Sequence, residues 1–316
     1  MMQAVRDGFG QEIYELVKNN PRIVVLAADL SDSLRLSQLR QDFPAQYVEC
    51  GVSEQNMIGV AAGLAMTGKI AVACSFAVFN PGRNWEQIRV SVCEQNLDVK
   101  IVGGHAGLTT GADGGTHQAL EDIALMTVLP EMKVVTACDA QEARAATQAM
   151  IATPGPVYLR LTRGETEPVE QGKTKFEWGK GRLIRTGEDA YIVTYGLTLP
   201  VALATSQLLH DEAGLSVGVV NMPTLKPLDE ALLLQIAQQT HTIITIEEHQ
   251  LTGGLGSLVA SCLAQREPVI MEMVGVDNRF GQSGTQMQLW EEYGLTVDNL
   301  KEKVLQALER KVECGW

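Results

Sequence analysis

Basic residues are scarce in this chain: 25 lysines and arginines stand against 38 acidic residues, which gives a formal net charge of −13. A nucleic-acid-binding protein needs basic patches, so this balance argues against a nucleic-acid partner, although it leaves room for a local anion site. No apolar run reaches the roughly 18 residues that a membrane helix needs, and the amino terminus lacks a secretory pattern. We therefore expect a cytoplasmic protein that makes no membrane contact.

Common metal and nucleotide motifs are also missing. The six cysteines show no C-x-x-C spacing and mostly lie in apolar stretches, so we expect reduced core residues and no zinc site. No segment reads G-x-G-x-x-G followed by a distant acid, or G-x-x-x-x-G-K-[ST]. The glycine-rich LTGGLGSL at 251–258 favours close backbone packing, and a phosphate cradle at a helix start is the alternative use.

What the sequence does contain is an alternation of strand-like apolar runs and helical periods, which is typical of a parallel α/β fold. With 316 residues, of which 45% are hydrophobic, the chain is long enough for two domains. We expect a first α/β unit at 1–165, a polar linker at 166–177 and a smaller second unit at 178–316.

The same patterns predict individual elements. In the first unit, strands are expected at 22–28, 69–76, 98–103, 133–138 and 157–161, and helices at 3–18, 54–66, 83–95, 117–127 and 140–151. In the second unit, strands are expected near 190–195, 216–220, 242–247 and 268–274, and a final helix at 296–312.

A loop at 103–119 (GGHAGLTTGADGGTHQA) concentrates candidate ligand-binding groups. It follows a strand and leads toward a helix, which is where α/β sheets bind ligands. Six of the thirteen residues from 103 to 115 are glycine, so the backbone can approach a ligand closely. His105, Asp113 and His117 can all hydrogen-bond a polyhydroxylated substrate. The alternative is a solvated loop whose polar residues only cap the next helix.

A carboxylate and two rings form a second candidate group. Glu54 falls in the first turn of its helix, behind the candidate cap Ser53, where the helix dipole favours a carboxylate. It could be an ordinary solvated residue, but small and apolar residues follow it and no basic residue is near it in the sequence. Phe76 and Phe79 stand at a strand end before a Pro-Gly turn, where they could clamp a flat heterocycle or simply pack in the core.

Three arginines lie near the boundaries of elements. The bidentate guanidinium of Arg6, Arg83 or Arg163 could bind a phosphate. Each of them, taken alone, could equally be a surface ion-pair partner.

In order and spacing, these segments resemble the carboxyl-terminal half of transketolase over essentially the whole chain. The matching segments are RDGFGQEI, VVLAADLSDS, ECGVSEQNMIGVAAGLA, SFAVFNPGRNWEQIR, GHAGLTTGADGGTHQALEDIA, VNMPTLKPLD, IEEHQLTGGLGS and GVDNRFGQSG. The resemblance implies a pyrimidine-binding thiamine-diphosphate domain, with a parallel sheet flanked by helices, followed by a smaller transketolase carboxyl-terminal α/β domain.

The resemblance also implies a cofactor site at matching positions. Glu54 matches the glutamate that hydrogen-bonds the aminopyrimidine of thiamine diphosphate and favours the imino tautomer that removes the thiazolium proton. Phe76 and Phe79 match aromatic residues packed around that pyrimidine.

A substrate site is implied next to it. His105, Asp113 and His117 match residues that contact ketose hydroxyls, and His105 also lies near the substrate phosphate in the family. Arg6 and Arg163 match the arginines that hold this phosphate. The resemblance therefore makes His105 and His117 catalytic together with Glu54.

The sequence departs from the family pattern at the substrate end. Ala27 stands where many members have a phosphate-binding serine, and Ala112 replaces the glutamate of the usual G-E-D-G. Residues 80–82 (Asn-Pro-Gly) replace a third aromatic that some members have. These departures leave the sugar pair open.

The diphosphate half of the family's site has no counterpart here. In the family, a G-D-G motif and a distant asparagine bind the diphosphate through Mg²⁺, and this sequence contains no G-D-G. The resemblance therefore implies the C-terminal chain of a split, two-chain transketolase, which itself holds no metal. Its partner, the N-terminal transketolase subunit, would bind most of the Mg²⁺–diphosphate. We expect an α2β2 heterotetramer acting on sugar phosphates, and self-association of the free chain through apolar surface.

Alternatives remain open at this stage. Within thiamine enzymes they are a deoxyxylulose-phosphate-synthase-like enzyme and a beta-type subunit of a 2-oxoacid dehydrogenase. The loop with His105, Asp113 and His117 favours sugars over a small oxoacid. An alternative of another class is a non-catalytic regulatory or binding subunit, against which the presence of Glu54 and Phe76 argues.

Overall fold

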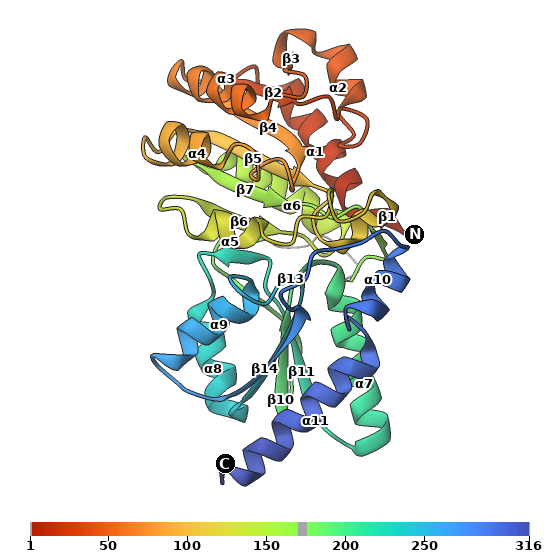
Figure 1. Ribbon diagram of the computed structural model, residues 1–316. Helices are drawn as coiled ribbons and strands as arrows, with labels where there is room; N and C mark the ends of the chain where they lie inside the picture. The colour runs from red at the N-terminus through yellow and green to blue at the C-terminus, as the bar shows by residue number, and fades with distance from the viewer. Residues whose placement is uncertain (1, 170–175, 316) are drawn as a thin grey trace.

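Two parallel-rich sheets, one above the other in Figure 1, form the framework of the protein. The computed structural model describes residues 2–169 and 176–315. The first sheet has seven strands in the order β12-β6-β7-β5-β4-β2-β3, and the second has five in the order β14-β13-β10-β11-β9. Neighbouring strands are parallel except at β12–β6 and β11–β9. The predicted α/β fold class is confirmed, with one antiparallel edge strand in each sheet.

The strands of the first sheet are β2 (Ile23–Ala27), β3 (Tyr47–Glu49), β4 (Ile70–Phe76), β5 (Val99–Gly104), β6 (Lys133–Thr136), β7 (Val157–Arg160) and β12 (Thr224–Lys226). Those of the second sheet are β9 (Arg182–Arg185), β10 (Ala190–Thr194), β11 (Val217–Asn221), β13 (Thr242–Gln250) and β14 (Ile270–Val276). A separate pair, β1 (Gln3–Ala4) and β8 (Glu165–Thr166), is antiparallel.

The α-helices are α1 (Val5–Asn19), α2 (Ser37–Asp42), α3 (Glu54–Met66), α4 (Trp85–Gln87), α5 (Asp122–Thr127), α6 (Ala140–Ala152), α7 (Leu199–Ala213), α8 (Glu230–Thr240), α9 (Leu255–Ala264), α10 (Gln286–Glu292) and α11 (Val297–Glu313). A π-helix spans Ile88–Cys93, and 3₁₀ turns span Pro44–Gln46, Leu108–Asp113 and Gly196–Thr198.

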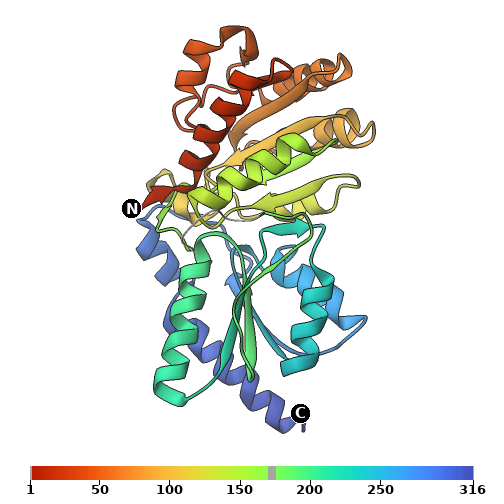
Figure 2. The ribbon, with the colours of Figure 1, turned by 180° about the vertical axis from the view of Figure 1, so that it is seen from behind.

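Helices cover both faces of the first sheet, which explains why its central strands are continuous apolar runs. Strands β2, β4 and β5 are buried at every residue. Helices α1 and α6 pack side by side on one face, and α3 lies on the other (Figure 2). Helix α1 buries Phe9, Ile13 and Val17, which recur every four residues as the sequence predicts.

Several predicted elements differ from the structure at their ends. The helix predicted at 3–18 begins at Val5, because the first residues pair as β1. The helix predicted at 83–95 is a short α4 followed by the π-helix. The helix predicted at 117–127 begins only at Asp122, because the preceding backbone bonds elsewhere: Leu120 accepts a hydrogen bond from Gln250 of the second domain. Ser53 is at the N-cap of α3, but its hydroxyl donates to the Cys50 carbonyl rather than capping the helix.

Strand β12 joins the two sheets in an unexpected way. It lies within 178–316 in sequence, yet it forms the edge of the first sheet beside β6. The Lys226 amine donates to the carbonyl oxygens of Thr127 (2.8 Å) and Leu129 (2.5 Å) in the first unit. The predicted division at 165 and 178 remains a prediction, and residues 170–175 of the predicted linker lie outside the described residues.

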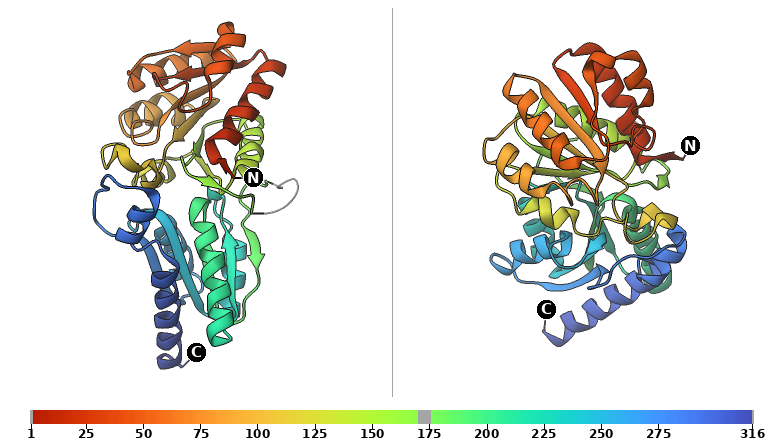
Figure 3. Two further views of the ribbon diagram at one scale, coloured as in Figure 1. Left: turned by 90° about the vertical axis from the view of Figure 1, so that its right-hand side faces the viewer. Right: turned by 45° about the horizontal axis from the view of Figure 1, so that its top comes forward.

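The core is continuous between the two units. One apolar cluster contains Met126 and Leu129 beside the first sheet together with Met222 and Leu225 from the second half of the chain. The final helix α11 runs along the outer side of the second sheet, away from the first (Figure 3). Within 2–169 and 176–315, no helix is both long and apolar enough to cross a bilayer.

Candidate active site

The predicted site residues meet at the carboxyl edge of the first sheet. Phe76 ends β4, His105 directly follows β5, and Arg163 follows β7 by three residues. The carboxyl ends of parallel strands share one edge, so these three side chains converge although they are far apart in sequence. Arg6 comes from the first turn of α1 and Glu54 from the first turn of α3.

An aromatic group forms the centre of the site. The rings of Phe76 and Phe79 are nearly parallel, with their centroids 6.2 Å apart. The His105 ring stacks on Phe76 at 3.9 Å, and the His117 ring meets Phe79 edge-on at 5.4 Å. The two histidines therefore contact the same pair of rings.

An arginine-lined cavity of about 310 Å³ adjoins this group. Arg6 Nη1 lies 2.8 Å from His105 Nε2, and both side chains line the cavity. Arg163 lies beside Asp113, with 3.4 Å between Nη1 and Oδ2. The remaining lining residues are Asp32, Ser33, Arg35 and Phe76.

His105 is neutral in this environment. Burial, followed by the guanidinium of Arg6, lowers the pKa of His105 to about 3. Because an arginine N–H faces Nε2, this nitrogen is the acceptor and the proton is assigned to Nδ1. Burial and the neighbouring Arg35 and Arg163 lower the pKa of Arg6. A neutral imidazole among three guanidinium groups gives a cavity suited to an anion.

The backbone of His105 is also unusual. Its φ is +54°, a left-handed conformation that residues other than glycine seldom adopt. Such strain persists where the surrounding structure fixes it, and it is concentrated at functional sites. Two residues that line the cavity share this conformation, His105, which links the aromatic group to the arginines, and Arg35 with φ +61°.

Glu54 has a basic neighbour that is distant in sequence. Its carboxylate is buried and accepts from Arg83 Nη1 at 3.0 and 3.1 Å. No basic residue is near Glu54 in the sequence, but folding brings Arg83 to it across 29 positions, so Arg83 binds a carboxylate rather than lining the anion cavity. The Arg83 guanidinium carbon also lies 4.0 Å from the centre of the Phe79 ring. A flat hydrogen-bonding group thus already sits between Glu54 and Phe79, so these two residues fit a flat nitrogen heterocycle.

The LTGGLGSL segment and Ala27 both lie in close-packed surroundings. The start of α9, which lies within LTGGLGSL at Leu255, is closely packed, because Glu247 occupies it and accepts from the N–H groups of Leu255 (2.7 Å) and Gly256 (2.8 Å), which leaves neither donor for a phosphate. Ala27 is fully buried in β2 among core residues and is not among the residues that line the cavity.

Sequence reasoning missed other contributors to the site. Arg35, Asp32 and Ser33 line the cavity from the loop after β2, and the sequence motifs assign no role to them. The signal was available, because DLSDS is a polar stretch directly after a buried strand. In the part of the chain that the structure describes, no group of three or more His, Cys, Asp or Glu could hold a metal ion.

Comparisons with known proteins agree over both halves of the chain. A family model described as "Transketolase, pyrimidine binding domain" matches residues 1–168, and one described as "Transketolase, C-terminal domain" matches residues 179–300.

Individual relatives match the full length. A Methanocaldococcus jannaschii protein named "Putative transketolase C-terminal section" is 38% identical, covering 98% of this chain and 98% of its own. The 6-deoxy-6-sulfo-D-fructose transketolase subunit SqwH of Clostridium sp. is 37% identical, and the match covers 97% of this chain and 95% of the relative. A solved structure described as "Split gene transketolase, inactive beta4 tetramer" is 43% identical with a TM-score of 0.90, and the match covers 97% of this chain and 98% of the chain in that structure.

Proposed function

The chain belongs to the transketolase family, and on that premise we propose that it is the carboxyl-terminal subunit of a two-chain, thiamine-diphosphate-dependent transketolase. It transfers a two-carbon ketol unit between a ketose and an aldose that carry phosphate. It acts together with a partner subunit that binds the diphosphate of the cofactor through Mg²⁺.

One observation carries this proposal: Glu54, the two phenylalanines, the two histidines and the arginines form one connected group. Arg83 links Glu54 to Phe79, and the rings lead through His105 to Arg6. A site with a carboxylate at one end and an arginine cavity at the other suits a cofactor ring and an anionic sugar side by side.

The chain's own residues then have distinct tasks. When bound, thiamine diphosphate supplies a nucleophilic carbon for attack on a ketose carbonyl. Glu54 would hydrogen-bond a pyrimidine nitrogen in the place that Arg83 now takes, and Phe76 and Phe79 would pack against the ring. Neutral His105 accepts from Arg6 through Nε2 and so holds that guanidinium at the cavity, and His117 lies across the rings from it.

The substrate's anionic end fits the arginine cavity. Arg6 and Arg163 offer bidentate guanidinium groups, and Asp113 beside Arg163 can accept from a sugar hydroxyl. This arrangement favours a sugar phosphate, which can place its phosphate among the three arginines and a hydroxyl beside Asp113, over a small oxoacid, whose carboxylate leaves Asp113 without a hydroxyl partner.

Dependence on a partner is supported by a relative. The solved structure with 43% identity is described as an inactive tetramer of beta chains. We propose an α2β2 assembly in which two copies of this chain and two partner chains build two sites.

The test is reconstitution with a candidate amino-terminal subunit. Thiamine diphosphate and Mg²⁺ are titrated by calorimetry into this chain, into the partner and into the mixture, and ketol transfer is assayed with a panel of ketose phosphates. We expect saturable cofactor binding and turnover only in the mixture, and loss of turnover in Glu54→Ala. Tight binding by this chain alone would contradict partner dependence. Pyruvate turnover without ketose turnover would favour the synthase-like or dehydrogenase-type alternative.

A further inference from the structure

A buried carboxylate of the second domain reaches into the loop that carries the predicted substrate residues. Glu248 lies on β13 and is 2% exposed. Its Oε1 accepts from the backbone N–H of Thr109 at 2.8 Å and from the indole N–H of Trp290 at 3.1 Å. A residue of the second sheet thus satisfies a backbone donor of the 3₁₀ turn beside the cavity.

The loop is shaped to receive this carboxylate. Gly107 has φ +80°, and a Cβ added there would lie 2.6 Å from the Glu248 carboxyl carbon. Both the backbone conformation and the space therefore require glycine. The loop and the carboxylate are in direct van der Waals contact.

The turn that Glu248 holds is itself hydrogen-bonded to His105 and Arg163. Thr110, which follows Thr109, donates its hydroxyl to the His105 carbonyl at 2.6 Å. The Thr110 carbonyl accepts from Arg163 Nη1 at 3.0 Å. A shift of this turn would therefore move the backbone of His105 and the guanidinium of Arg163 together.

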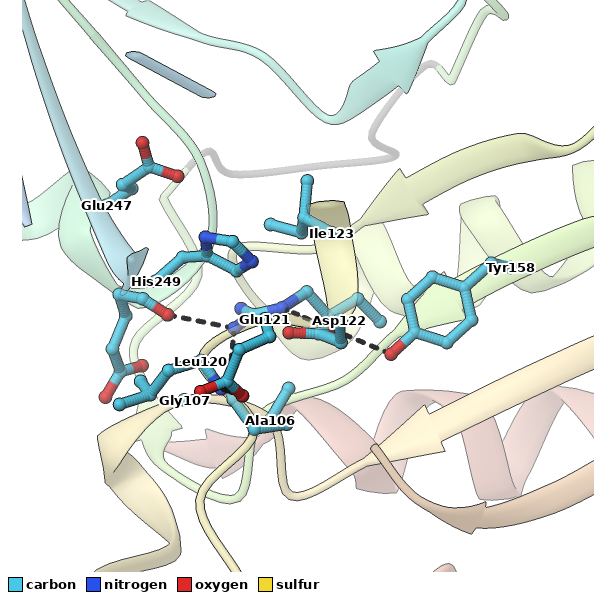
Figure 4. Close-up of polar contacts among 12 residues, drawn as sticks. Ala106, Gly107, Leu120, Glu121, Asp122, Ile123, Tyr158, Glu247 and His249 are labelled. Atoms are coloured by element: carbon cyan, nitrogen blue, oxygen red, sulfur yellow. Dashed lines mark hydrogen bonds and ion pairs between the residues drawn. The ribbon is translucent and has the colours of Figure 1, made fainter. Parts of the chain in front are cut away.

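The strand that carries Glu248 is itself fixed to the first domain. Arg160, fully buried at the end of β7, donates from Nη2 to the Glu248 carbonyl at 2.9 Å and from Nε to Asp122 at 2.8 Å. The Tyr158 hydroxyl also donates to Asp122, as Figure 4 shows, with His249 and Glu247 on the opposite side of the same interface. The first sheet therefore fixes the backbone of Glu248. The side chain of Glu248 in turn holds a loop of that same sheet.

We propose that Glu248 is a positioning residue of the substrate site, through which the second domain holds the turn at 107–110 and thereby sets His105 and Arg163 for the anionic end of the sugar. The part played in catalysis rests on the proposed function. The anchoring of the turn does not, and the two are tested separately.

The anchoring is tested on the full chain without a partner, by amide hydrogen exchange. In Glu248→Ala the Thr109 amide loses its acceptor, and we expect the peptide that contains it to exchange at least about tenfold faster. The matched control is Glu247→Ala, the preceding buried glutamate, which holds the start of α9 and does not touch the turn. The control should speed exchange at 255–256 and leave 107–110 unchanged. Equal exchange of the turn in both variants would overturn the proposal.

The variant Glu248→Gln distinguishes the loss of the hydrogen bond to Thr109 from the loss of side-chain volume. Burial raises the pKa of Glu248 to about 7, so the amide of Glu248→Gln approximates its protonated form and keeps an acceptor oxygen for Thr109. We expect exchange in this variant to stay near that of the wild-type chain. Exchange as fast as in Glu248→Ala would contradict a role for the oxygen.

The catalytic consequence is tested in the reconstituted complex. Glu248→Ala should raise the KM for a ketose phosphate about tenfold, with a smaller change in kcat and an unchanged Kd for thiamine diphosphate. Glu248→Gln should restore the KM, and Glu247→Ala should leave it within twofold. A KM no higher than that of Glu247→Ala, or a parallel loss of cofactor affinity, would overturn the positioning role. A complex that lacks ketol transfer altogether would refute the proposed function, and the exchange result would still decide the anchoring.

Discussion

The imidazole of His105 is held neutral by its neighbours. It is buried, stacked on Phe76 and hydrogen-bonded to a guanidinium, and these contacts lower its pKa to about 3. A positive charge there would be buried and would face the Arg6 guanidinium at 2.8 Å. His105 therefore acts as a hydrogen-bonding group of fixed charge at physiological pH.

A pH titration checks this state. We expect the ring resonances of His105 in NMR spectra to stay constant between pH 5 and 8, whereas those of an exposed histidine move near pH 6.5. Because the folded pKa lies below the unfolded one, the stability that depends on neutral His105 is present above about pH 6.5 and is lost as the pH falls toward about 3. His105→Asn should make this acid-side loss shallower in thermal unfolding. A His105 signal that titrates near 6.5 would contradict the assignment.

Arg83 competes for the carboxylate and ring that the cofactor is proposed to use. Its guanidinium contacts both Glu54 and Phe79, and its side chain is 47% exposed, so it can leave without disturbing the core. Replacing it by alanine should tighten binding of thiamine diphosphate to the reconstituted complex about fivefold, the equivalent of a partly exposed ion pair worth about 1 kcal/mol. Calorimetric titration measures the change.

The control for Arg83→Ala is Arg89→Ala, which removes the same charge from an exposed position on the π-helix. It should leave the affinity unchanged. If Arg83→Ala weakens binding instead, Arg83 supports the cofactor site rather than competing for it.

At this scale, the sequence predicted the residue types of the site better than their partners. Glu54, the phenylalanines and the loop histidines were identified through local motifs and the family resemblance. The Arg83–Glu54 pair spans 29 positions and the Thr109–Glu248 bond spans 139. No periodicity or spacing rule relates residues so far apart, because only the packed sheets bring them together.

At the scale of elements, close helix packing depends on particular glycines. Helix α1 places Gly8 against the backbone of α6, and a Cβ at this position would lie 2.0 Å from the Ala140 carbonyl oxygen. Gly59 on α3 is exposed and has nothing within 4 Å of an added Cβ. The two helical glycines therefore have opposite roles.

Substitution by alanine should separate them. Gly8→Ala forces α1 away from α6 and should destabilise the chain by about 1–3 kcal/mol. Gly59→Ala removes backbone freedom from an exposed helix and should stabilise it by up to about 1 kcal/mol. Chemical denaturation of the two variants gives both values, and a loss of stability in Gly59→Ala of the same size as in Gly8→Ala would refute the distinction.

The elements that the sequence predicted well are those with a strong local signal. Strands β2 and β4 are continuous apolar runs, and α3 has the predicted bounds of 54–66. Strand β12 has three residues and no pattern of its own, because its backbone is fixed by pairing with β6. The late start of α5 likewise follows from contacts with the second domain, which no local window contains.

At the scale of the whole molecule, the two sheets depend on one another. Strand β12 completes the first sheet, Glu248 anchors its substrate loop, and one apolar cluster crosses the interface. The motifs predicted two α/β units, but the extent of this sharing could not be read from either unit alone.

Dividing the chain tests this dependence. A fragment of residues 1–169 lacks β12 and leaves the edge of β6 and an apolar surface uncovered. We expect it to aggregate, or to melt at least about 10 °C below the full chain, and to regain solubility when residues 176–316 are co-expressed. Calorimetry and size-exclusion chromatography follow both outcomes. A fragment as stable as the intact chain would show that the first sheet does not need β12.

The late position of β12 in the sequence also determines when the first sheet can be completed during synthesis. Six strands of the first sheet have been made by Arg160, but the seventh begins at Thr224, after β9, β10 and β11. During that interval the nascent chain presents the open edge of β6, which is the time when chaperones would bind it and when pairing with another chain is easiest. During synthesis the first sheet thus stays incomplete until residues 224–226 have been made and pair with β6.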